Sequence, residues 1–229
     1  MSVRSVVLFD IDGTLVWGGP AKDSFVDAMI DVYGTPGDAD NVSFAGKTDP
    51  QIARELLADA GFSHEDISNG FDDLWSRYLT NLEARLPERP VTVLPGVPDL
   101  LSALAHRNDI GIGLLTGNIA GGARLKLSSG GLWGHFAFGS YGSDHEHRDE
   151  LPTIALGRAR ELWGAHIEPG AAIVVGDTPR DVQCGKAGNT RTLAVATGTF
   201  SVDDLAATNP DHLLPDLTST EDVVAMLLG

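Results

Sequence analysis

The chain has 229 residues, of which 42% are hydrophobic and 21% charged, and its formal net charge is −16. These values are normal for a globular protein, and the length fits one large domain or a domain with an insertion. The strong negative charge repels nucleic acids and anionic membranes, so neither is an expected partner. The single cysteine, Cys184, excludes an internal disulfide framework and a CxxC metal site.

The N-terminal segment and the hydropathy of the chain predict a cytoplasmic protein. MSVRSVVLFD reaches an acidic residue too early for a signal peptide. Apolar runs stay well short of the roughly 20 residues that a membrane span needs. For the oligomeric state, both a monomer and a homodimer remain open.

Short apolar runs recur along the chain and predict strands that are buried on both faces of a parallel sheet. The runs are Val6–Phe9, Ile110–Leu115 and Ala171–Val175, with Leu193–Ala196 and Phe136–Tyr141 as weaker candidates. Loops and stretches of helical periodicity alternate with these runs, which is typical of βαβ units. The pattern therefore predicts an α/β fold with a doubly wound, Rossmann-like parallel sheet.

Residues 16–95 break this alternation, because they have helical periodicity throughout. Helices are expected over Ala21–Tyr33, Pro50–Ala60 and Ile67–Leu86. Ser63 is a candidate N-cap for the last of these helices. Residues 1–15 and 96–229 would then form the α/β core, and residues 16–95 an all-helical insert.

The position of this insert indicates a lid. The insert leaves directly from the loop after the first predicted strand, and ligands bind outside the carboxyl ends of strands in such sheets. A helical bundle that only enlarges the hydrophobic core is the alternative.

The segment LFDIDGTL, residues 8–15, places two carboxylates at the end of the first predicted strand. Asp10 and Asp12 are two residues apart, so in extended chain they point to the same face. Gly13 permits the tight turn that follows. An ordinary turn containing aspartate and glycine is the alternative, but it leaves the second aspartate at the end of a buried strand unexplained.

The segment IVVGDTPRD, residues 173–181, repeats this arrangement. Asp177 ends an apolar strand, Pro179 suits the first turn of a helix, and Asp181 follows four residues after Asp177. Carboxylates gathered at neighbouring strand ends repel one another, so a hard cation with oxygen ligands is expected among them. Mg²⁺ fits, because it takes few carboxylates and keeps water and substrate phosphate as further ligands.

A third segment, LLTGN, ends a strand at Thr116 and opens a helix with Gly117 and Asn118. A hydroxyl and free backbone N–H groups at a helix N-terminus bind phosphate oxygens well. An ordinary strand-to-helix turn is the alternative for this segment taken alone.

In their order and spacing, the three segments together resemble the haloacid dehalogenase-like superfamily. The helical insert after the first motif resembles the type-1 cap of that superfamily. The segment Gly46-Lys47-Thr48-Asp49 is similar to a cap loop of its phosphoglycolate phosphatase-like members. The resemblance implies a Mg²⁺-dependent phosphatase that acts on a small phosphorylated metabolite, such as phosphoglycolate or a sugar phosphate.

The resemblance also implies a role for each motif residue. Asp10 would attack phosphorus and become phosphorylated, and Asp12 would act first as general acid and then as general base. Mg²⁺ would bind Asp177, one oxygen of Asp10 and the backbone carbonyl of Asp12. Thr116 would hold a phosphoryl oxygen, and Asp181 would support the site from behind the metal ligands. The expected substrate-binding residues are Gly13, Thr14, Lys47, Thr48, Gly117 and Asn118.

The superfamily also places a cation, usually lysine, on the phosphoryl group. The segment HEHRDELPTIAL, residues 145–156, has no lysine, and Arg148 stands where that lysine is expected. We favour Arg148 for this role over an exposed loop arginine, because an acidic phosphate site requires a cation and arginine grips phosphate well. Lys126 is the second candidate, although we interpret it as a residue of a helix surface.

Two alternatives concern the reaction itself. In the phosphatase reaction, Lys47 would contact an anionic part of the substrate or would be a simple surface lysine. The first alternative to that reaction is C–P cleavage, in which Lys47 would form a Schiff base with the substrate as in phosphonoacetaldehyde hydrolases. A Schiff-base lysine requires a desolvated pocket. The second alternative is a non-catalytic binding module, which would be expected to have lost one of the four acids.

Overall fold

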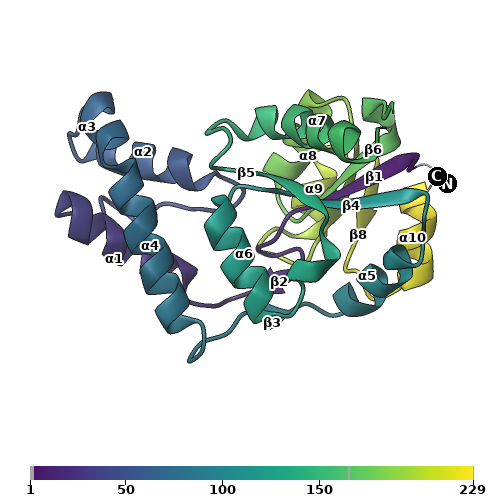
Figure 1. Ribbon diagram of the computed structural model, residues 1–229, viewed down its shortest axis with the longest axis horizontal. Coiled ribbons are helices and arrows are strands. Elements are labelled where there is room, and N and C mark those ends of the chain that lie inside the picture. The colour runs from purple at the N-terminus through teal and green to yellow at the C-terminus, as the bar shows by residue number, and fades with distance from the viewer. Residues whose placement is uncertain (1–2, 165, 229) are drawn as a thin grey trace.

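The computed structural model describes residues 3–164 and 166–228, and these form a six-stranded parallel sheet flanked by helices (Figure 1). The strand order is β5-β4-β1-β6-β7-β8. The strands are β1 Ser5–Phe9, β4 Ile110–Thr116, β5 Phe138–Tyr141, β6 Ala172–Gly176, β7 Arg191–Val195 and β8 His212–Leu214. From β1 the chain adds β4 and β5 on one side and then adds β6, β7 and β8 on the other, so the strand order reverses at β1. This confirms the predicted doubly wound fold.

Helices cover both faces of the sheet. They are α5 Val97–Ala105, α6 Ala120–Ser129, α7 Leu151–Trp163, α8 Pro179–Ala187, α9 Val202–Ala206 and α10 Thr220–Leu228. Successive residues of β1 separate the two cores, as expected for a strand. Val6 and Leu8 pack with α7 and α8, whereas Val7 and Phe9 belong to the core that contains α5, α6 and α10. The strand is therefore apolar along its whole length because both of its faces are buried.

Four further helices lie beside the sheet, at the left of Figure 1. They are α1 Ala21–Tyr33, α2 Asp49–Asp59, α3 His64–Asn69 and α4 Phe71–Arg85. Helix α1 packs against α4, and Phe25 of α1 contacts Trp75 and Tyr78 of α4 through its ring. The apolar core of this helical group is continuous with the core on one face of the sheet.

Two predictions within the insert were wrong. Ile67–Leu86 is not one helix, because α3 ends and α4 begins at Gly70. Ser63 caps the short α3 by accepting a hydrogen bond from the Asp66 backbone N–H at 3.1 Å. Glycine is a weak helix former, and a Cβ at Gly70 would collide with the Tyr33 ring, so packing against α1 favours a break here.

The insert is also not helical throughout. Strands β2 Val16–Trp17 and β3 Thr92–Val93 pair antiparallel where the chain enters and leaves the helical group. Both strands contain a β-branched valine, and β3 lies between prolines, which favours extended chain.

The sequence analysis did not predict the edge strand β8. This strand has three residues, which are too few to show the alternation of apolar and polar residues that marks a strand. Among the residues described, no helix combines the length and the hydropathy needed to cross a membrane.

Candidate active site

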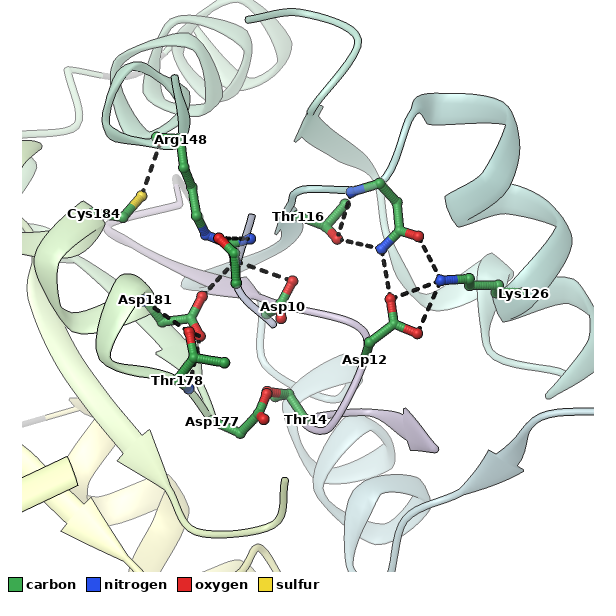
Figure 2. A network of polar contacts seen from close by, with 12 residues as sticks. Asp10, Asp12, Thr14, Thr116, Lys126, Arg148, Asp177, Thr178, Asp181 and Cys184 are labelled. Carbon is green, nitrogen blue, oxygen red and sulfur yellow. Dashed lines mark hydrogen bonds and ion pairs between the residues drawn. The ribbon is translucent and has the colours of Figure 1, made fainter. Parts of the chain in front are cut away.

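The carboxyl ends of β4, β1 and β6 lie side by side, and each predicted motif follows one of them. Asp10 and Asp12 follow β1, Thr116 is the last residue of β4, and Asp177 follows β6. Because these three strands are neighbours, segments more than 100 residues apart meet at one edge of the sheet, as Figure 2 shows.

Three buried carboxylates form the centre of this edge. Asp10, Asp177 and Asp181 have exposed fractions of 4%, 3% and 2%, and oxygen atoms of the three lie within 4.8 Å of one another. Burial and the neighbouring charges of Asp181 and Asp10 raise the pKa of Asp177 to about 8. Burial raises the pKa of Asp10 to about 6, although Arg148 opposes the rise. Three carboxylates thus lie around one guanidinium, that of Arg148, and would carry excess negative charge when all three are ionised.

Small residues make room for the Asp177 carboxylate. A Cβ on Gly13 or on Gly198 would collide with it, and Gly13 has a φ of 85°, which favours glycine. One carboxylate oxygen accepts a hydrogen bond from Thr14 Oγ1 at 3.0 Å. An oxygen-only donor set with excess negative charge fits a hard divalent cation such as Mg²⁺.

Arg148 is buried within this acidic cluster, with an exposed fraction of 5%. It begins a short 3₁₀ turn before α7, and its Nη2 lies 3.1 Å from Asp10 Oδ1 and also pairs with Asp181. Burial opposes the arginine charge, but Asp181 and Asp10 outweigh this effect and raise its pKa. The exposed-loop alternative for Arg148 is therefore wrong, and the structure places its guanidinium beside the predicted nucleophile.

Asp181 is held by both of its oxygens. Oδ2 accepts hydrogen bonds from the Thr178 backbone N–H at 3.0 Å and from Thr178 Oγ1 at 2.7 Å, which forms a capping box at the start of α8. Its other oxygen accepts from Arg148. This geometry suits a residue that fixes Arg148 and the turn after β6.

A second polar network surrounds Asp12, at the right of Figure 2. Lys126 Nζ donates to the two Asp12 carboxylate oxygens at 2.9 and 2.8 Å and to Asn118 Oδ1 at 2.6 Å. Asn118 Nδ2 donates to Asp12 Oδ2 at 2.7 Å and to Thr116 Oγ1 at 2.8 Å. The two carboxylates of the first motif thus have different cationic partners.

The prediction that Lys126 lies on a helix surface was wrong, because its exposed fraction is only 5%. Lys126 shares the buried face of α6 with Gly122, Ala123 and Leu127. Gly122 and Ala123 are small and let the helix approach closely, and the long lysine stem crosses the buried region to reach Asp12. Lys126 lies three residues after Ala123 and four after Gly122, so the sequence alone could have placed it on the same helix face as these small residues.

The Gly46–Asp49 segment contacts the sheet edge mainly through backbone. The Asp49 N–H donates to the Gly117 carbonyl at 2.8 Å. A Cβ on Gly117 would collide with the Lys47 carbonyl, and a Cβ on Gly142 would collide with the Gly117 carbonyl. We call this contact the glycine seam. The absence of a side chain at Gly117 therefore lets the Gly46–Asp49 segment approach the end of β4 closely. The predicted contact of Gly117 with phosphate would be a separate role.

Side chains of this segment reinforce the seam. Asp49 Oδ2 accepts from the Ile119 backbone N–H at 2.8 Å, just before α6. Thr48 Oγ1 donates to the Glu146 carbonyl at 2.7 Å and accepts from the Gln51 N–H at 3.2 Å as the N-cap of α2. Sequence reasoning gave Asp49 no role, because its partner lies in a different part of the chain.

Lys47 forms an ion pair with Glu55 of α2, and its side chain is 15% exposed. Lys47 thus has a carboxylate partner within the helical group.

A cavity of about 530 Å³ lies between the strand ends and the helical group. The predicted residues that line it are Asp10, Asp12, Gly13, Lys47, Thr116, Gly117, Asn118, Arg148 and Asp177, together with the second candidate cation, Lys126. Thr14, Thr48 and Asp181 do not line it, although Thr14 and Asp181 contact the lining residues Asp177 and Arg148. Apolar residues of the helical group, including Phe25, Ile52 and Tyr78, form the opposite wall. This volume accommodates a small organic molecule together with its polar group.

Comparisons with known proteins identify a family of hydrolases. The sequence model of a family described as haloacid dehalogenase-like hydrolase matches residues 7–195. The chain is 30% identical over 196 residues to phosphoglycolate phosphatase 1 of Pseudomonas aeruginosa, covering 84% of this chain and 70% of that protein. It is 26% identical over 231 residues to the pyrophosphatase PpaX of Oceanobacillus iheyensis, covering 99% and 98% of the two chains. A predicted phosphatase from Clostridium acetobutylicum shares the fold, with a TM-score of 0.72, 18% identity, and coverage of 98% of this chain and all of that one.

Proposed function

Since the chain belongs to the haloacid dehalogenase-like hydrolase family, we propose that it removes phosphate from a small-molecule monoester through an aspartyl-phosphate on Asp10. One observation carries this proposal most directly. Asp10 lines the cavity at the end of β1, and a buried guanidinium lies 3.1 Å from its carboxylate. The phosphatases among its relatives support phosphoric monoester hydrolysis as the reaction.

In the first step, an Asp10 oxygen attacks phosphorus, and the bond from phosphorus to the leaving oxygen breaks. Asp12 gives its proton to that oxygen, so an alcohol departs. In the second step, water attacks the phosphorus of the acyl phosphate and gives a proton to Asp12. The bond between phosphorus and Asp10 then breaks, which releases inorganic phosphate and restores both carboxyl groups to their starting state.

The remaining site residues stabilise charge and position the phosphoryl group. Arg148 balances negative charge on the phosphoryl oxygens, and the Thr116 hydroxyl and the backbone of Gly117 and Asn118 would hold them. Asp10, Asp177 and the Asp12 backbone carbonyl would bind Mg²⁺, which supplies positive charge where the phosphoryl group transfers. The excess charge of the acidic cluster supports this assignment.

We also propose that residues 16–95 act as a cap on a core made of residues 1–15 and 96–229. The cap wall of the cavity would select the leaving group, and closing it would exclude water from the reaction. The name of one relative, phosphoglycolate phosphatase 1, supports phosphoglycolate as the kind of substrate, and a sugar phosphate is the second candidate. From its composition, we expect a cytoplasmic protein, monomeric or dimeric, without nucleic-acid or membrane partners.

The two alternative functions receive less support. A Schiff-base role for Lys47 requires a free amine in a desolvated pocket, whereas Lys47 is paired with Glu55. A non-catalytic module is disfavoured because Asp10, Asp12, Asp177 and Asp181 are all present and converge at one sheet edge.

The deciding experiment uses p-nitrophenyl phosphate with Mg²⁺ or with EDTA, and then a panel of phosphorylated metabolites. Wild type should turn over only with Mg²⁺ and, after acid quenching, should carry phosphate that is absent from Asp10→Asn. Asp99→Asn, at an exposed position of α5, is the matched control and should retain full activity. Absence of turnover on every substrate, with Mg²⁺ bound, would contradict the proposal.

A further inference from the structure

Lys126 lines the cavity, and its ammonium group contacts protein oxygens there. Three oxygens lie within hydrogen-bond distance of Lys126 Nζ. Those oxygens belong to Asp12 and Asn118, at 2.6 to 2.9 Å. A second cation beside a phosphate site would ordinarily be assigned to the phosphoryl group. The close contacts of Nζ with both Asp12 oxygens and with Asn118 indicate a different role.

Asn118 completes the restraint on Asp12. Its Nδ2 donates to Asp12 Oδ2, and its Oδ1 accepts from Lys126, so each of the three side chains contacts the other two. Thr116 fixes the amide further, because its Oγ1 accepts from both the backbone N–H and Nδ2 of Asn118, at 3.3 and 2.8 Å. The ring therefore connects the loop after β1 to β4 and α6.

The restraint acts on a side chain that is otherwise free. The Asp12 side chain is 45% exposed and faces the cavity, whereas the side chain of Lys126 is 6% exposed. Asp12 is followed by Gly13, whose backbone has few steric limits. Without partners, such a carboxylate would sample several rotamers in solvent.

We propose that Lys126, together with Asn118, is a positioning residue that holds the Asp12 carboxyl group in place for both proton transfers. The inference rests on the proposed function, in which Asp12 gives a proton to the leaving oxygen and later takes one from water. A general acid must lie about 2.6–3.2 Å from the atom it protonates. A misplacement of about 1 Å can slow a reaction ~10²-fold. Lys126 contacts both carboxylate oxygens, so one of them stays held whichever oxygen exchanges the proton.

The site thus divides its two buried cations between its two catalytic carboxylates. Arg148 pairs with Asp10 and Asp181 and is the cation next to the reacting phosphorus. Lys126 pairs with Asp12 and acts on the proton transfers alone. The two assignments predict different kinetics. A phosphoryl-binding cation affects every substrate alike, but a residue that acts through the general acid matters most when the leaving group is poor.

The test measures phosphorylation of Asp10 in single turnovers with phenyl phosphate and with p-nitrophenyl phosphate, two substrates of similar shape. Nitrophenolate leaves readily without a proton, whereas phenolate needs one. In Lys126→Met, phosphorylation by phenyl phosphate should slow by about 10²-fold, and by p-nitrophenyl phosphate much less. KM should change little. With p-nitrophenyl phosphate, the phosphoenzyme should accumulate, because water attack also requires Asp12.

A double-variant cycle separates positioning from general damage to the fold. Lys126→Met should have no further effect in an Asp12→Asn background, and Asn118→Ala should show the same leaving-group dependence as Lys126→Met. Equal slowing on both substrates with a raised KM would overturn the inference in favour of phosphoryl binding, and so would an undiminished effect in the Asp12→Asn background. Failure of wild type to form any phosphoenzyme would instead overturn the proposed function.

Discussion

The two walls of the cavity differ in chemistry. The core wall carries charged and hydrogen-bonded groups at strand ends, including Asp10, Asp12 and Arg148. The cap wall is largely apolar, with Phe25 and Ile52, and the charge of Lys47 is balanced by Glu55. Under the proposed function, the core would determine the reaction and the cap would determine which leaving group fits. Substitutions in the core should therefore lower kcat on every substrate, and those in the cap should change KM selectively.

The largest effect should come from Arg148→Met. Removal of the guanidinium leaves Asp10 and Asp181 buried without their cation, and loss of one partner of a buried pair costs about 3–5 kcal/mol of stability. We also expect kcat to fall ~10³-fold on aryl and alkyl phosphates alike. Steady-state kinetics and urea unfolding measure the two effects, with Arg148→Lys as a charge-conserving control. A fall in kcat on only one class of substrate would contradict the claim that residues of the core wall affect all substrates alike.

Asp177→Asn tests the metal assignment through stability. The Asp177 carboxyl has a folded pKa of about 8 against an ordinary value of 3.8. Folding therefore favours its protonated form, and the stability it contributes is lost as pH rises from about 4 to about 8. In EDTA at pH 8.5, Asp177→Asn should melt above wild type by on the order of 5 °C, and the gap should shrink at pH 5.

Mg²⁺ completes this test. It should raise the melting temperature of wild type at pH 8.5 and have little effect on Asp177→Asn, because binding requires the ionised carboxylate. An equal response of both proteins to Mg²⁺ would remove Asp177 from the metal site.

A smaller and selective effect is expected from Glu55→Gln in the cap. The substitution frees Lys47 from its ion pair, so Lys47 can attract an anionic leaving group. KM for phosphoglycolate should fall by about 3- to 10-fold, while KM for p-nitrophenyl phosphate and kcat for both stay the same. Lys47→Met should reverse the gain. An unchanged preference between the two substrates would show that Lys47 does not face the leaving group.

The smallest effect is expected from Ser63→Ala, far from the cavity. Ser63 caps α3, and loss of such a cap typically costs ~1 kcal/mol of stability. Urea unfolding should show this decrease with no change in kcat or KM. A loss of activity would mean that the fold of α3 affects the core wall.

The sequence predicted the core wall better than the cap wall, for physical reasons. Asp10, Thr116 and Asp177 each end a strand with an unmistakable apolar run, and parallel strands bring their carboxyl ends together. Lys126 was misplaced because a lysine in a helix of small residues looks exposed until its distant partners, Asp12 and Asn118, are known. The break at Gly70 has the same origin, since it depends on the Tyr33 ring of another helix.

The glycine seam has a consequence for the proposed movement of the cap. Gly117 meets the Lys47 carbonyl and the Asp49 N–H backbone to backbone, and Gly142 packs behind Gly117, so few rotamers would be ordered at this contact. Ordering a long side chain costs up to about 2 kcal/mol, and this contact largely avoids that entropy. If the proposed cap closes in each turnover, such a seam would form and separate without a large barrier. A methyl group at position 117 would collide with the Lys47 carbonyl and hold the two surfaces apart.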